Sequence, residues 1–202
     1  VFLPLQRVLR SHALPVPLLH DLLSAFAQDV EMTARGATYP DRAALLDYCR
    51  RSANPVGRLL LHLYGVQGEA ALRESDAICS ALQLINFWQD LSVDIPRGRH
   101  YLADADCAAH GVSRAELAAL RPTPATTRLL HDNAQWARAL MQSGAPLVHR
   151  LPGRAGWELR LVVQGGLRIL DRIDALHGAN LCRRPVLGPL DWLHMLARAV
   201  RM

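Results

Sequence analysis

Four polar side chains between positions 83 and 94 have the types and the spacing of a cation-binding site. Gln83, Asn86, Asp90 and Asp94 are separated by three, four and four residues. On a helix this spacing places all four on one face, over about three turns. Two carboxylates one turn apart repel each other unless a cation compensates, and Mg²⁺ is commonly held by one or two carboxylates together with substrate phosphates. The two aspartates alone are better explained as a solvated acidic pair, but the two amides on the same face and the flanking Phe87-Trp88 favour a site for a magnesium-bound diphosphate.

Two flanking segments add groups that could contact such a ligand. Arg97, Arg99 and Tyr101 follow the stripe in a loop. Guanidinium groups are preferred partners of phosphate oxygens, although loop arginines are also common in water. Upstream, helix is interrupted at Asn54-Pro55, because proline removes a backbone donor and disfavours helix in the preceding residue. Such a break either lines a cavity or is a plain kink.

The elements that must position these residues are helical almost throughout. Alanine, leucine and arginine dominate, and no run of alternating β-branched residues predicts a strand. Periodicity, caps and prolines predict helices over 18–35, 41–52, 58–64, 68–93, 126–149, 154–177 and 192–201. Leu22, Phe26 and Val30 support the first of these at four-residue intervals, and Ser113 with Glu116 forms a capping box for a further short helix. We therefore predict one all-α domain of antiparallel helices, with the kink and the loop over 95–103 as its irregular parts.

Composition narrows the class of protein. The 202 residues are 50% hydrophobic and 20% charged, which excludes disorder and low-complexity sequence. No apolar run is long enough to cross a bilayer. The four cysteines are too far apart for a metal or redox pair, the nine histidines lack zinc-site spacing, and no strand precedes a glycine-rich dinucleotide motif. We expect a cytoplasmic protein with reduced cysteines and no nicotinamide cofactor.

Two segments resemble the squalene/phytoene synthase family, the head-to-head trans-prenyltransferases. QLINFWQDLSVDIPRGRHYL, from Gln83, is similar to the family's second aspartate-rich motif. YCRRSANPVGRLLLHLYG, from Tyr48, is similar to its YC…(V/S)A…VG segment. The form SANPVG and the later RRPVLGPLDW resemble one bacterial branch in particular, the hydroxysqualene synthases of hopanoid biosynthesis.

The resemblance implies a fold and a set of roles. The fold is an isoprenoid-synthase helical bundle with a central cavity, and the catalytic residues are Tyr48, Asp90 and Asp94. The two aspartates match the family's second pair of Mg²⁺-diphosphate ligands, and Tyr48 matches a tyrosine near the reacting carbons. The predicted substrate-binding residues are Ser52, Ala53, Val56, Gly57, Gln83, Asn86, Phe87, Arg97, Arg99 and Tyr101. The implied reaction is Mg²⁺-dependent ionisation of presqualene diphosphate to hydroxysqualene, with release of diphosphate.

One departure from the family pattern concerns the beginning of the chain. The family has a first aspartate-rich motif on an early helix, and this chain shows none. The segment HDLLSAFAQDV, which contains Asp21 and Asp29, resembles the helix after that motif, and the chain does not begin with Met. We expect residues 1–202 to be the C-terminal portion of one such domain, inactive without the rest. Two alternatives stay open: a sister synthase that condenses two prenyl diphosphates to presqualene diphosphate, squalene or phytoene, and a non-catalytic helical assembly protein.

The C-terminal segment predicts a surface for a partner. It runs from Arg183 and Arg184 through Pro185, Val186 and Leu187 to a helix with Trp192, Leu193, Leu196, Arg198 and Arg201. Basic residues and an interfacial tryptophan favour peripheral contact with the inner face of a membrane, whereas the alternative is that Trp192 and Leu196 dock on the bundle. No recognition motif accompanies the basic residues, so we expect no nucleic-acid partner. The pattern predicts no particular oligomeric state.

Overall fold

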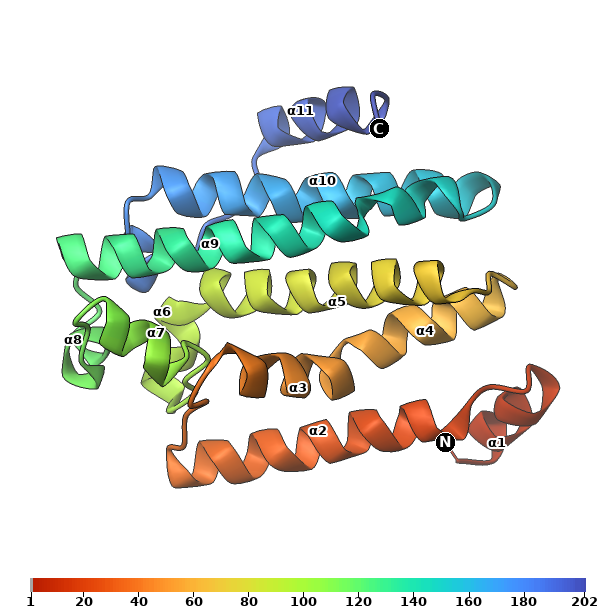
Figure 1. The fold of residues 1–202 in the computed structure, drawn as a ribbon, viewed down its shortest axis with the longest axis horizontal. Coiled ribbons are helices and arrows are strands. Elements are labelled where there is room, and N and C mark those ends of the chain that lie inside the picture. The colour runs from red at the N-terminus through yellow and green to blue at the C-terminus, as the bar shows by residue number, and fades with distance from the viewer. Residues whose placement is uncertain (1) are drawn as a thin grey trace.

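The computed structural model describes residues 2–202, and every regular element in this range is a helix (Figure 1). The first six are α1 (Phe2–Ser11), α2 (Val16–Arg35), α3 (Arg42–Ser52), α4 (Asn54–Leu63), α5 (Glu69–Gln89) and α6 (Leu91–Asp94). The others are α7 (Asp104–Ala109), α8 (Arg114–Ala118), α9 (Pro124–Gly144), α10 (Gly153–Ala175) and α11 (Pro189–Ala199). Three short 3-10 helices join them: η1 (Ile95–Arg97), η2 (Ala145–His149) and η3 (Ala179–Leu181). The predicted all-α fold is confirmed.

The long helices are layered around α5. This helix packs against α9 and α10 on one side and against α3 and α4 on the other. It is buried around most of its circumference, as a helix with neighbours on both sides must be, and Leu84 and Trp88 within it are fully buried. α2 packs outside α3 and α4, and α11 packs outside α10, so α2 and α11 lie at opposite edges of the molecule (Figure 1).

Local sequence signals place several helix ends. Asp41 caps α3 by accepting a hydrogen bond from the backbone N–H of Ala44 at 2.8 Å. The predicted capping box of α8 is present, because Glu116 Oε2 accepts from the N–H of Ser113 at 2.8 Å and the Ser113 side chain caps Glu116 in return. Thr123 caps α9 in a similar way.

Other predicted boundaries are wrong. The helix predicted over 68–93 ends at Gln89, and the one predicted over 126–149 ends at Gly144 and continues as η2. Pro146 explains the second change, because its ring and its missing N–H do not fit the interior of an α-helix. The last helix begins at Pro189 rather than 192, since proline is well suited to the first helical turn. α1 and α7 were not predicted.

α2 has close to the predicted extent, and the side that faces the bundle mixes apolar and polar residues. Phe26 and Val30, whose spacing with Leu22 predicts the helix, are 60% and 69% exposed. The inward side carries Ala25, which is fully buried, and the half-buried Leu22, Gln28, Asp29 and Met32. Apolar periodicity therefore identified this helix correctly, but two of the three apolar residues that support it face solvent.

The predicted break at Asn54-Pro55 brings α4 close to α5. Asn54 is buried, and its side-chain oxygen accepts a hydrogen bond from Ser80 Oγ of α5 at 2.9 Å. A Cβ atom at Gly57 would overlap Ser75 Oγ and Cys79 Sγ, so a larger residue there would force both side chains to move. The break thus lets α4 turn onto α5 instead of extending α3.

α11 is attached to α10 through a buried carboxylate. Asp191 is fully buried and accepts hydrogen bonds from Arg168 Nε at 2.6 Å, from Arg172 Nη2 at 2.8 Å and from the Gly188 N–H at 2.7 Å. These donors, the Arg172 guanidinium first among them, hold the pKa of Asp191 well below its usual range. Met195 completes the contact with apolar packing, since it is buried against Gly165.

Replacing Asp191 by asparagine is expected to loosen α11. The variant removes the charge that both guanidinium groups bind, so at pH 7 its melting temperature should be lower and amide exchange in α11 should be faster. Because the folded pKa is depressed, this stabilisation is present above the unfolded value of 3.8 and is lost as pH falls below it. Wild type and variant should therefore converge in acid. Glu158→Gln on α10 is the control, and equal melting temperatures at pH 7 would contradict the assignment.

Candidate functional site

The predicted polar stripe spans a junction between two helices. α5 ends at Gln89, Asp90 caps it, and α6 follows immediately. The i to i−4 bonding persists across this junction: the N–H of Asp90 donates to the carbonyl of Asn86 at 3.0 Å, and the N–H of Asp94 donates to the carbonyl of Asp90 at 2.8 Å. The stripe therefore keeps its direction, with Asn86 exposed and Gln83, Asp90 and Asp94 half-buried.

Asp94 belongs to a charge cluster that includes a residue outside the predicted set. Arg99 lies between two carboxylates, with Nη1 3.8 Å from Asp94 Oδ1 and Nη2 3.7 Å from Asp29 Oδ2. The hydroxyl of Tyr101 donates to Asp29 Oδ1 at 2.5 Å. Asp29 comes from α2, so the cluster joins the outer helix to the segment after α6. No local pattern in the sequence marks Asp29 as a member of this cluster, because it reaches Arg99 and Tyr101 only through the packing of α2.

The electrostatics of this cluster favour an additional cation. Burial raises the pKa of Asp94 above its usual range; Arg99 and Arg97 act against this shift, while Asp90 and Asp29 add to it. A raised carboxyl pKa means that the ionised form is short of compensating positive charge. A divalent cation between Asp90 and Asp94 would supply that charge.

Asp90 is paired with an arginine from a distant segment. The Nε of Arg184, between α10 and α11, donates to Asp90 Oδ1. The next residue, Pro185, is buried, and its carbonyl oxygen accepts from Gln89 Nε2 at 2.8 Å. The sequence pattern predicts that Arg184 and Pro185 belong to a membrane surface. The structure places them at the end of α5 instead, because this segment closes over Gln89 and Asp90.

The donor set fits a magnesium ion that shares its ligands with a diphosphate. Asp90 and Asp94 supply carboxylate oxygens one turn apart. Within residues 2–202 no group of three or more His, Cys, Asp or Glu side chains is arranged to hold a metal by itself. Mg²⁺ usually keeps several waters and takes one or two carboxylates together with substrate phosphates, so two aspartates are an adequate protein contribution.

Four aromatic rings pack beside this cluster. Phe87 and Tyr101 are stacked, with centroids 3.7 Å apart and planes 7° apart, and Tyr48 lies 6.1 Å from Phe87. Tyr39 adds a fourth ring at 5.6 Å from Tyr48, and it too was not predicted. All four are buried. Burial raises the pKa of Tyr48 to about 12, so its phenol is neutral at physiological pH. The cluster can present π-faces but no phenolate.

An apolar cavity of about 300 Å³ lies between α4, α5, η2 and α10. Its lining includes the predicted residues Val56 and Gly57, and Cys79 and Leu82 of α5. Cys79 precedes Asp90 by eleven residues, or about three turns, so the cavity wall and the polar stripe share one face of α5. At about 1.5 Å per residue, Leu82 lies about 12 Å from Asp90 along the helix. An apolar chamber is therefore followed on the same face by carboxylates.

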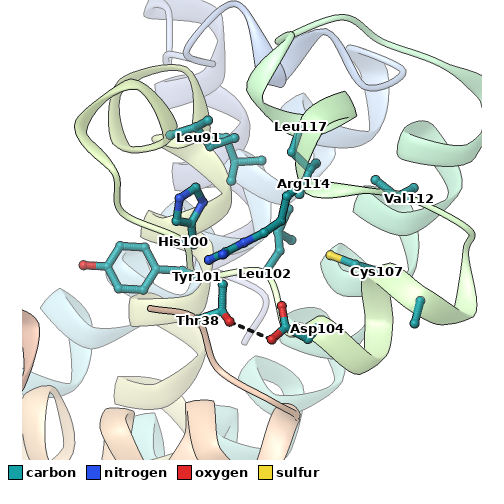
Figure 2. Close-up of a pocket in the computed structure, with 12 residues that line it drawn as sticks. Thr38, Leu91, His100, Tyr101, Leu102, Asp104, Cys107, Val112, Arg114 and Leu117 are labelled. Atoms are coloured by element: carbon teal, nitrogen blue, oxygen red, sulfur yellow. Dashed lines mark hydrogen bonds between the residues drawn. The ribbon is translucent and has the colours of Figure 1, made fainter. Parts of the chain in front are cut away.

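A second pocket, of about 160 Å³, lies behind the loop that carries Arg99 and Tyr101 (Figure 2). Thr38 donates to Asp104 Oδ2 at 2.6 Å, and Arg114 donates to the carbonyl of Gly36 at 2.8 Å. The ring of Tyr101 points away from the other side chains drawn in Figure 2. Thr38, Asp104 and Arg114 are thus engaged in contacts between the segment after α2 and helices α7 and α8, which support the loop from behind.

The remaining predicted residues belong to neither the charge cluster nor the aromatic cluster. Ser52 and Ala53 are half-buried at the break between α3 and α4, and Ser52 Oγ is buried without a hydrogen-bond partner. Arg97 is exposed in η1. The structure therefore brings the predicted residues into two neighbouring groups, one polar at the end of α5 and one apolar along α4 and α5.

The sequence matches the family model for squalene/phytoene synthase over residues 1–191. The chain belongs to the squalene/phytoene synthase family. Hydroxysqualene synthase of Sinorhizobium fredii is 32% identical over 176 residues, which cover 86% of this chain and 58% of that protein. Hydroxysqualene synthase of Rhodopseudomonas palustris is 32% identical over 191 residues, covering 94% of this chain and 63% of that protein. Phytoene synthase of Thermus thermophilus is 35% identical over 158 residues, covering 78% of this chain and 54% of that protein.

Solved structures in the squalene/phytoene synthase family share this fold. The crystal structure of squalene synthase HpnC from Alicyclobacillus acidocaldarius superposes with a TM-score of 0.80 at 34% identity, covering 86% of this chain and 64% of that one. A dehydrosqualene synthase at 18% identity superposes with a TM-score of 0.84, over 94% of this chain and 65% of that one, and supports the fold alone. The chain spans less than two thirds of the length of these curated relatives and structures.

The contact between Arg184 and Asp90 predicts competition with a metal. Arg184→Ala frees the Asp90 carboxylate, so calorimetric titration without substrate should show about two- to fivefold tighter binding of Mn²⁺, as expected for a partly exposed ion pair. Arg183→Ala is the matched control, because Arg183 is the neighbouring arginine and is exposed without an ion pair in residues 2–202. Unchanged or weaker Mn²⁺ binding in Arg184→Ala would show that this arginine does not oppose a metal at Asp90.

Proposed function

We propose that the protein forms hydroxysqualene from presqualene diphosphate in a Mg²⁺-dependent reaction that releases diphosphate. Two hydroxysqualene synthases at 32% identity support this substrate. The observation that carries the proposal is the shared face of α5, where the apolar cavity is followed by Asp90 and Asp94 with arginines beside them. A ligand with a hydrocarbon body and a diphosphate end matches that order of surfaces.

Asp90 and Asp94 are the residues that would hold the metal, and bound Mg²⁺ would neutralise charge on the leaving diphosphate. Arg99 and Arg184 each lie against one of these carboxylates, within reach of a ligand bound there. Guanidinium groups so placed would bind phosphate oxygens and hold the diphosphate in position. The exposed Arg97 adds positive charge at the outer end of the site.

The reaction breaks the carbon–oxygen bond to diphosphate, which leaves with the bonding electrons. Water then adds to the carbocation and loses a proton, giving the alcohol. The cation must meet no other nucleophile first, and apolar walls with aromatic faces provide that protection. Tyr48 and Phe87 are the rings we assign to this role, because both are buried in the aromatic cluster next to the polar group.

We also propose that residues 1–202 are the C-terminal portion of one longer domain, and that the remaining metal ligands come from outside this sequence. The length of the relatives supports this, since the matches cover 58% and 63% of the two hydroxysqualene synthases. Activity is therefore to be measured on the full-length protein. For its location we propose the cytoplasm with peripheral contact at the inner face of the membrane, where a long hydrocarbon substrate and product would reside.

A sister synthase activity is the second candidate. It is favoured by the phytoene synthase of Thermus thermophilus, which is 35% identical over 158 residues. Such an enzyme condenses two prenyl diphosphates instead of hydrating the cation from one. Full-length protein given presqualene diphosphate and Mg²⁺ without a reductant should yield a C30 alcohol if the first proposal holds. Turnover of farnesyl diphosphate alone would support the sister activity, and no turnover of either would support a non-catalytic assembly protein.

Asp90→Asn is expected to abolish this activity without unfolding the protein. The side chain is half-buried at the end of α5 and contributes no core packing, so the variant loses only the charge that would bind the metal and the partly exposed ion pair with Arg184. We expect kcat to fall by about a hundredfold or more, as for loss of a major electrostatic contribution. Glu69→Gln, at the opposite end of α5 and 91% exposed at its side chain, is the control. Near-parental turnover in Asp90→Asn would refute the metal role.

Variants of Tyr48 distinguish a role of its aromatic ring from a role of its hydroxyl group. Because its phenol is neutral and buried among other rings, Tyr48→Phe should keep kcat within about threefold of the parent, whereas Tyr48→Ala should lose activity together with stability. Product analysis of Tyr48→Phe supplies a second readout, since a pure wall residue leaves the product unchanged. A large fall in kcat with an unchanged KM would instead assign chemistry to the hydroxyl.

A further inference from the structure

The outermost helix, α11, has three distinct faces. A narrow face is buried against α10 through Asp191, Met195 and Ala199. An exposed apolar face occupies about 160° of the circumference, at about 100° per residue. Its members are Leu190, Trp192, Leu193, Leu196, Ala197 and Val200. The third face, between these two, carries the exposed residues His194, Arg198 and Arg201.

The apolar face is open because α11 is held by its polar anchor. Leu190 is 78% exposed, Leu193 is 65% exposed and Val200 is 67% exposed. Trp192 and Leu196, for which docking on the bundle was the alternative expectation, are 54% and 49% exposed. Contiguous apolar surface bordered by charged residues marks an interaction site. Within residues 2–202 no helix is long and apolar enough to span a membrane.

The charges around α11 indicate the partner. Over residues 183–202 the basic side chains are Arg183, Arg184, Arg198 and Arg201, and the only acidic one is Asp191. Asp191 is fully buried and bound by Arg168 and Arg172, so it contributes no exposed negative charge. The exposed charged side chains of this segment are therefore all positive. An apolar face with a basic edge and a tryptophan is the chemistry of helices that lie in the headgroup region of anionic membranes.

The opposite edge of the molecule provides an internal comparison. α2 also exposes an apolar stripe, with Leu23 at 64%, Phe26 at 60% and Val30 at 69%. Its charged residues are three acidic ones and the single basic Arg35. α2 itself has comparable apolar exposure without the positive charge that anionic lipid requires. Figure 1 shows the two helices on opposite sides of the bundle.

We propose that the exposed apolar face of α11, with Arg198 and Arg201 at its edge, is a docking surface for an anionic lipid bilayer. The helix lies parallel to the membrane, with Leu193 and Val200 in the acyl boundary and Trp192 at the headgroups. The biological purpose of this contact rests on the proposed function, which needs access to long hydrocarbons. The contact itself is measured without catalysis, so its failure and that of the proposed reaction are distinguishable.

The test is flotation of the purified protein with vesicles of phosphatidylcholine, with and without phosphatidylglycerol. We expect binding to the anionic vesicles and at least tenfold weaker binding to phosphatidylcholine alone. Leu193→Glu should reduce binding at least tenfold, whereas Leu23→Glu on α2, of matched exposure, should leave it unchanged. The double variant Arg198→Glu/Arg201→Glu should lose about tenfold or more, since each basic residue strengthens attraction to an anionic surface. Arg121→Glu/Arg128→Glu, at two exposed arginines outside α11, is the charge control.

Fluorescence quenching by brominated lipid reports which tryptophan enters the membrane. Quenching should be lost in Trp192→Phe and retained in Trp157→Phe, although both residues are about half exposed. Absence of binding to anionic vesicles, or equal loss in Leu193→Glu and Leu23→Glu, would overturn the proposal. So would a wild-type dimer that Leu193→Glu converts to a monomer in sedimentation, because the face would then be an interface between two copies.

Discussion

Negative charge at the carboxyl end of α5 is the constraint on which the arrangement of this site depends. The last carbonyl groups of a helix carry partial negative charge, so a carboxylate at that end is unfavourable unless positive charge is brought to it. Asp90 caps this 21-residue helix, and Asp94 follows one turn later in a half-buried position. Two distant segments supply the compensation: Arg184 from beyond α10, and Arg99 from the loop after η1. The raised pKa of Asp94 indicates that this compensation is incomplete.

That constraint also explains how the outer helix is attached. α2 places Asp29 against Arg99 and Tyr101, and its Gln28 and Ser24 accept hydrogen bonds from Arg51 of α3. The helix is thus fixed to the site by polar contacts, while Phe26 and Val30 face outward. Exposed or partly exposed polar contacts each contribute little to stability, whereas apolar burial contributes more. The attachment of α2 therefore serves the geometry of the charged cluster more than the stability of the bundle.

Much of the fold was predictable because its signals are local. The caps at Asp41 and Ser113 and the break at Asn54-Pro55 depend on a few neighbouring residues, and the structure has each of them. The spacing of Asn86, Asp90 and Asp94 survived the unpredicted end of α5, because the hydrogen bonds continue through Asp90. Asp29, Tyr39 and Arg184 could not be found in this way, since they reach the site only through the packing of α2 and of the segment before α11. Apolar periodicity located α2 but did not reveal its inward side, because Phe26 and Val30 are exposed while Gln28 and Asp29 face the bundle.

Helices α2 and α11 expose apolar side chains to a similar extent, and they differ in the sign of the charged residues beside those side chains. At α2 the side facing the bundle mixes apolar and polar residues, and the charged residues of the helix are three acidic ones and Arg35. The one acidic residue of α11, Asp191, is buried and paired with Arg168 and Arg172. The charged side chains on the outer surface of α11 are therefore arginines alone. An anchor made of apolar contacts would have had to bury part of the apolar face that α11 instead displays. A buried carboxylate attaches the helix from a narrow side, which leaves apolar residues and positive charge available together on the outside.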